Sequence, residues 1–167
     1  MARLRRADRW GDEPRLLKAA FRRFAGSGVR SKREALEFLA RKGCPPDEAG
    51  AWLADCERRG LIDDRAAAKL WAGNWARQDY ADAAIREKLL AKGFTDTTID
   101  ESIAALQSDT DDDARARRAL AGALRRSGGR RSPARLARAL ASRGFGSELV
   151  ERVLAASSIT TDSDTHD

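Results

Sequence analysis

Apolar residues recur along this chain at spacings of three and four, which is the period of an amphipathic α-helix. Ala49, Trp52, Leu53 and Cys56 form one such stripe, and no segment shows the sustained alternation typical of a strand. The pattern predicts nine helices between about residues 14 and 157. They are expected at about 14–25, from Ser31 to Gly43, from Pro45 onward, at about 64–77, 82–92 and 96–106, after the acidic residues 109–113, from Ser132 to Gly144, and around Val150, Val153 and Leu154.

A motif repeats along the chain with a period of about fifty residues. The segments LEFLARKGC, REKLLAKGF and ARALASRGF align on Gly43, Gly93 and Gly144, with steps of 50 and 51 residues. In each copy a Leu stands four residues before the glycine and a Lys or Arg one residue before it. Such a repeat indicates one supersecondary unit copied three times, and such arrays are elongated scaffolds that bind along a surface.

The expected architecture is therefore all-α, with three tandem three-helix repeats in an elongated array. The repeats are expected at 14–62, 63–108 and 109–157, with a disordered basic arm at 1–13 and a disordered tail at 158–167. Ser31 and Glu34 have the spacing of a capping box. Each aligned glycine is expected to end a helix in the left-handed conformation.

The charge of the chain favours an anionic partner. Its formal net charge is +6 over 167 residues, and Ala114 to Ser147 contains no acidic residue. Arginines in such a patch suit phosphate groups or an acidic protein groove. The candidate partner-binding residues are Arg115, Arg118, Arg125, Arg126, Arg130, Arg131, Arg135 and Arg138, with Arg77, Tyr80, Arg86 and Lys92 as weaker candidates. Arginines at positions 3, 5, 6 and 9 add a basic arm.

The residues that could carry catalysis favour structural roles. Asp63 and Asp64 precede a helix, where Asp is a common cap, and the single His166 lies in the acidic tail. The chain has no Cys/His ligand cluster and no phosphate-binding loop. Trp71 and Trp75 are expected in the core, as is Cys56. These observations predict a protein that is not an enzyme and holds no cofactor or metal. The protein is also expected to span no membrane, to be a monomer and to be cytoplasmic.

Four blocks resemble the RecX family, the regulators of the RecA recombinase. They are SKREALEFLARKG (31–43), GLIDDRAAAKLWAGNWAR (60–77), AAIREKLLAKGF (83–94) and RLARALASRGF (135–145), and the resemblance covers about residues 14–157. The family tends to have Phe where this chain has Ala67, and often has Gly near Ala81.

The resemblance implies a curved, elongated body of three three-helix repeats. It also implies a partner, the RecA filament on single-stranded DNA, in whose helical groove the protein lies. Binding there would block ATP hydrolysis and strand exchange by RecA, or promote filament disassembly. Such a protein would act in recombination, DNA repair and the SOS response.

Two other functions stay open on the sequence. One is a DNA-binding protein, transcriptional or non-specific, that acts through the arginine-rich third repeat. Asn74, Gln78 and Gln107 are the chain's only Asn and Gln residues, which is poor equipment for reading adenine. The other is a structural adaptor that uses its repeats to hold other proteins.

Overall fold

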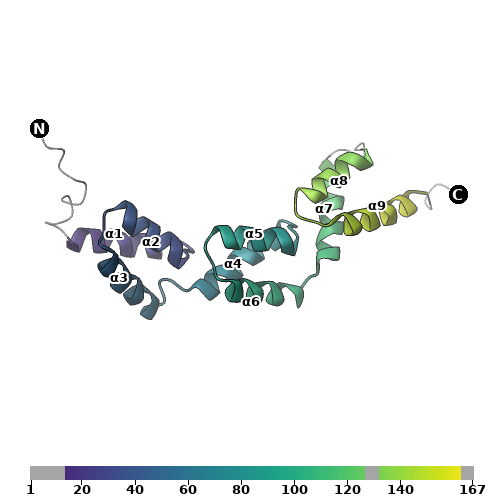
Figure 1. Cartoon of the computed structure of the whole chain (residues 1–167). Helices are drawn as coiled ribbons and strands as arrows, with labels where there is room; N and C mark the ends of the chain where they lie inside the picture. The colour runs from purple at the N-terminus through teal and green to yellow at the C-terminus, as the bar shows by residue number, and fades with distance from the viewer. Residues whose placement is uncertain (1–13, 127–131, 163–167) are drawn as a thin grey trace, which may run out of the picture. The chain divides into compact units, whose positions relative to one another are not determined.

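The computed structural model describes residues 14–126 and 132–162, and within these ranges the backbone forms nine α-helices and no strand (Figure 1). The all-α prediction is confirmed. The expected basic arm lies outside the described residues. The helices are α1 (Pro14–Gly26), α2 (Lys32–Arg41), α3 (Pro46–Arg58), α4 (Asp64–Arg77), α5 (Asp82–Ala91), α6 (Asp96–Gln107), α7 (Asp112–Arg126), α8 (Pro133–Ala141) and α9 (Ser147–Asp162).

The last helix is longer than the sequence pattern indicated. We expected order to end at residue 157, but α9 continues to Asp162. No Gly or Pro interrupts this stretch, so nothing in the backbone forces the helix to stop earlier. Among the described residues, no helix is long and apolar enough to cross a membrane.

The helices form two compact units. The first contains the chain up to Leu70 together with Leu90–Ile99, and the second contains Trp71–Leu89 together with the chain from Asp100 onward. Residues 63–108, expected to form the second repeat, therefore contribute to both units. The division into three repeats stays a prediction.

The core of the first unit lies among α1, α2 and α3. The apolar stripes of these helices meet there, because each stripe lies on one side of its helix. Phe24 and Phe38 stack with ring centroids 4.3 Å apart, and Cys56 is only 1% exposed, which confirms its expected place in the core. The buried residues of this core include Leu17, Phe21, Ala25, Ala35, Leu39, Ala49 and Leu53.

The core of the second unit lies among α7, α8 and α9, whose labels mark one bundle in Figure 1. α7 contributes mainly small residues to this core, so its neighbours can approach it closely. The buried residues are Ala81, Ala116, Ala119, Leu120, Ala123, Leu136, Leu140, Phe145, Val150 and Val153.

The three aligned glycines follow helices in the left-handed conformation. Their φ angles are 77° at Gly43, 83° at Gly93 and 89° at Gly144. The N–H of Cys44 donates to the carbonyl of Leu39 at 3.0 Å, which is the bond that closes a Schellman turn. The predicted role of these glycines as helix stops is confirmed.

Candidate partner-binding surface

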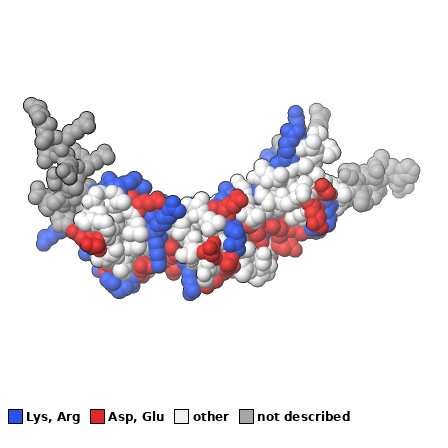
Figure 2. Space-filling view, in the orientation of Figure 1, with Lys and Arg blue, Asp and Glu red and all other residues white. Residues whose placement is uncertain are grey.

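Acids from outside the arginine-rich segment compensate part of its charge. Arg118 pairs with Asp79 at 2.9 Å, and Arg117 pairs with Asp113. The 34-residue stretch without acids is therefore not a continuous free cation surface. On the face drawn in Figure 2, acidic and basic side chains are interspersed over the described helices.

Arg115 does not belong to a partner-binding surface. Its side chain is 0% exposed, and its Nη2 donates to a carboxylate oxygen of Asp112 at 2.7 Å and to one of Asp82. Burial of an unpaired guanidinium would cost the fold a large amount of free energy. The two carboxylates offset this cost. The prediction that Arg115 contacts a partner is therefore wrong. The sequence did contain one indication of this pairing, because Asp112 lies three residues earlier on α7 and therefore on the same helix face.

Five of the main candidate arginines are exposed among the described residues, and one of them, Arg118, pairs with Asp79. We call the other four the basic surface: Arg125 and Arg126 in the last turn of α7, and Arg135 and Arg138 on α8. α7 and α8 pack against each other. None of the four pairs with a carboxylate among the described residues. Cations at the end of α7 also suit its helix dipole. Arg130 and Arg131 lie outside the described residues.

Tyr80 is held between two cations of the chain. Lys88 Nζ lies 4.5 Å from its ring centroid and Arg143 Cζ lies 5.7 Å from it, within the range of a cation–π contact. Trp71 and Trp75 stack with centroids 5.4 Å apart and are half-buried. The two tryptophans are thus only partly in the core, where the sequence pattern had placed them.

The other weaker candidates are also engaged within the chain. Arg77 donates to the side chain of Asn74, and Arg86 pairs with Asp100. Both arginines keep exposed atoms. Lys92 pairs with Glu34 at 3.0 Å, and its side chain is 22% exposed.

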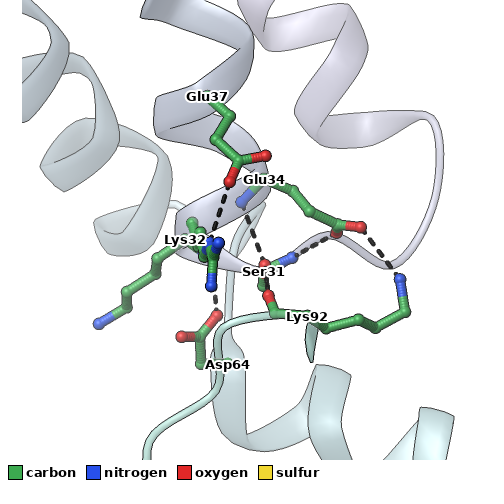
Figure 3. Close-up of polar contacts among 7 residues, drawn as sticks. Ser31, Lys32, Glu34, Glu37, Asp64 and Lys92 are labelled. Atoms are coloured by element: carbon green, nitrogen blue, oxygen red, sulfur yellow. Dashed lines mark hydrogen bonds and ion pairs between the residues drawn. The ribbon is translucent and has the colours of Figure 1, made fainter. Parts of the chain in front are cut away.

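Lys92 belongs to a contact that we call the first junction, where the start of α2 meets the turn after α5 (Figure 3). Ser31 Oγ donates to the carbonyl of Lys92 at 2.8 Å, and the N–H of Lys32 donates to Asp64 Oδ1 at 2.8 Å. Ser31 N donates to Glu34 Oε2 at 3.0 Å, and Glu34 N donates back to Ser31 Oγ at 3.1 Å. The predicted capping box is therefore confirmed.

The paired acids Asp63 and Asp64 cap two different helices. Asp63 Oδ1 accepts from Ala66 N at 3.0 Å at the start of its own helix, as predicted. Asp64 instead accepts from Lys32 N at the start of α2. Burial raises the pKa of Asp64, against the hydrogen bond from Lys32, which lowers it. No group of three or more Cys, His, Asp or Glu in the described ranges is placed to hold a metal.

Glu34 makes the first junction sensitive to acid. Burial alone would raise its pKa, but the hydrogen bonds from Ser31 and Lys92 hold the pKa below the ordinary value of 4.5. A carboxyl with a depressed folded-state pKa stabilises the fold above its unfolded-state pKa, and this contribution is lost as pH falls through the folded-state pKa.

We therefore expect wild type and Glu34→Gln to differ most in free energy of unfolding above pH 4.5, the ordinary value for this group. The difference should shrink as pH falls further. Urea denaturation at a series of pH values measures it. A difference that is constant with pH would show that the ionised carboxylate is not what stabilises the junction.

A second junction has the same layout fifty residues later, at the start of α5. Ala81 N donates to the carbonyl of Arg143 at 2.9 Å, and Asp82 N donates to Asp112 Oδ1 at 2.9 Å. Ala81 and Asp82 occupy the places of Ser31 and Lys32, and Arg143 occupies that of Lys92. The first junction lies in the first unit and the second lies in the second unit. This recurrence supports the predicted repeat.

The glycine after each of these turns packs against the helix start that the turn contacts. A Cβ on Gly93 would lie 2.1 Å from Arg33 Cδ, and one on Gly144 would lie 2.5 Å from Ala84 Cβ. Glycine at these positions thus allows close approach as well as a positive φ. The sequence pattern predicted only the second of these roles.

The solved structures that are similar to this chain include two RecX structures. One, the crystal structure of RecX from Lactobacillus salivarius, has a TM-score of 0.69 and 14% sequence identity over 84% of this chain and 94% of that chain. The other, the crystal structure of regulatory protein RecX, has a TM-score of 0.67 and 18% identity over 83% of this chain and 70% of that chain. No protein-family model matches the chain, and comparison with curated proteins gives no match. The chain has the RecX fold, so the predicted resemblance is confirmed for the fold.

Proposed function

We propose that this chain is a regulator that binds the RecA–DNA nucleoprotein filament and inhibits ATP hydrolysis and strand exchange by RecA. The observation that carries the proposal is the RecX fold over more than four fifths of the chain. The four blocks that resemble the family in sequence support the same assignment. In this role the protein acts by binding and supplies no catalytic group of its own.

The basic surface gives this proposal a candidate contact. Arg125, Arg126, Arg135 and Arg138 are exposed on two helices that pack together, so their guanidinium groups are available to carboxylates or phosphates. Arginine suits both, because its planar fork can donate two parallel hydrogen bonds. A surface of this kind increases the rate and the specificity of association with an acidic partner.

The test is the rate of single-stranded-DNA-dependent ATP hydrolysis by the cognate RecA, measured with increasing amounts of this protein. Binding to naked DNA is measured beside it at the same salt concentration. Inhibition at amounts well below those that coat the DNA supports filament binding. Absence of inhibition, with tight salt-dependent DNA binding, would instead favour a DNA-binding protein that acts through the same arginines.

Charge reversal tests the basic surface directly. We expect Arg126→Glu combined with Arg138→Glu to weaken inhibition by about tenfold or more, since repulsion replaces two attractive contacts. Arg23→Glu combined with Arg41→Glu is the matched control, because both arginines are exposed on α1 and α2. Equal inhibition by the two folded double variants would remove the basic surface from the contact.

A further inference from the structure

The residue twelve positions before each aligned glycine lies at the start of a helix. At the first and second junctions a turn from elsewhere in the chain contacts this residue, whereas no described turn does so at the start of α8. This position holds Ser31, Ala81 and Ser132. Ser31 and Ala81 are both 0% exposed, and each is hydrogen-bonded to a turn that ends a helix. Ser132 is exposed and makes no side-chain capping bond. Among the described residues, no turn covers the same edge at the start of α8.

The charge at this third edge is the reverse of the charge at the first junction. Glu34 lies nine residues before its glycine and pairs with Lys92 at 3.0 Å. The corresponding residue of the third copy is Arg135, which is exposed, and Arg138 follows one helical turn later. A turn that docked here would meet cations, so an acidic side chain would suit the place that Lys92 occupies at the first junction.

We propose that the edge formed by Ser132, Arg135 and Arg138 binds the last turn of a helix of an acidic partner protein. The turn presents a carbonyl to Ser132, as Lys92 does to Ser31, and an Asp or Glu to Arg135. This inference rests on the proposed function, in which the partner is the recombinase filament. It adds which edge of the chain is used and which kind of element the partner contributes.

A second copy of this chain does not fit the edge. The turns at Lys92 and Arg143 are already engaged at the first and second junctions. A second copy would therefore have to present the turn at Lys42–Gly43, whose two residues are exposed. Lys42 would then face Arg135, and like charges in contact oppose association. The charges therefore favour an acidic partner over head-to-tail self-association.

Two variants separate docking from general attraction between charges. Ser132→Arg adds a positive charge but fills the edge with a long side chain, and Arg135→Glu reverses the charge that would meet the partner. We expect each to weaken binding to RecA filaments on single-stranded DNA by about tenfold or more, as loss of a central contact does. Arg41→Glu, on α2, is the control and is expected to bind as wild type does.

Each outcome decides a different question. If wild type does not bind the filament, the proposed function fails and this inference fails with it. If wild type binds and Ser132→Arg binds equally or more tightly, general attraction is sufficient and only the docking edge is wrong. A photo-crosslinking residue at the exposed Ala134 gives a second readout. Cross-links to the recombinase protein support the edge, whereas cross-links only to the DNA would overturn it.

Discussion

Replacement of Arg115 by Met is expected to lower the free energy of unfolding by about 3–5 kcal/mol. The guanidinium is fully buried and bonds two carboxylates, those of Asp82 and Asp112. Without it, the two negative groups lie near each other with no cation between them. Asp82 is 18% exposed, so water relieves little of the unfavourable energy on that side.

Arg117→Met is the matched control for this experiment. Arg117 lies on the same helix and pairs with Asp113, but its side chain is 68% exposed. An exposed ion pair contributes only about 0–1 kcal/mol, because solvent screens both charges. Urea denaturation of both variants measures the difference. Similar midpoints for the two variants would show that Arg115 does not hold the second junction together.

The sequence predicted the helices well because their signals are local. The apolar period, the capping box of Ser31 and the aligned glycines each depend on residues within a few positions of one another. These features placed eight of the nine helices close to their observed ranges. The ninth helix was predicted to be too short. The polar composition after residue 157 indicated disorder, but no Gly or Pro interrupts the helix before Asp162.

The same reasoning failed for Arg115 because one of its two carboxylate partners, Asp82, is distant in the sequence. The stretch from Ala114 onward has no acids of its own, but Asp79 and Asp82 reach it from 39 and 33 residues earlier in the chain. Composition along a segment cannot show which carboxylates the fold brings to it. Asp64 is a similar case, since it caps α2 across 32 residues.

The candidate site was predictable only in part for the same reason. Exposure of Arg126 and Arg138 follows from their places on amphipathic helices, and the structure agrees. Tyr80 and Lys92 were selected by residue type, but internal cations and carboxylates engage both. The open edge at Ser132 became visible only when the two occupied edges could be compared with it.

Replacement of Gly144 by Ala is the second change with a large expected effect. A residue with a Cβ costs about 1–2 kcal/mol in the left-handed conformation, and Gly144 has a φ of 89°. The new Cβ would also lie 2.5 Å from Ala84 Cβ and 3.0 Å from Ala84 N. Overpacking of this kind costs about 1–3 kcal/mol, so the free energy of unfolding should fall by about 2–5 kcal/mol in total.

Gly60→Ala separates the two causes. Gly60 has a φ of 67°, but a Cβ there would meet nothing within 4 Å. It should therefore lose only the conformational part, about 1–2 kcal/mol. If both glycine variants lose the same stability in urea denaturation, the close approach of Gly144 to α5 contributes nothing.

A compensating change identifies the contact itself. Ala84→Gly removes the atom nearest to the new Cβ, so it should recover part of the stability that Gly144→Ala loses. Ala84→Gly alone is expected to destabilise the chain by about 0.5–1 kcal/mol, because glycine weakens a helix. The double variant should therefore lose less free energy of unfolding than the sum of the losses of the two single variants. A double-mutant cycle measures this difference. Strict additivity would mean that the turn before Gly144 does not pack on the start of α5, and the second junction would lose its physical basis.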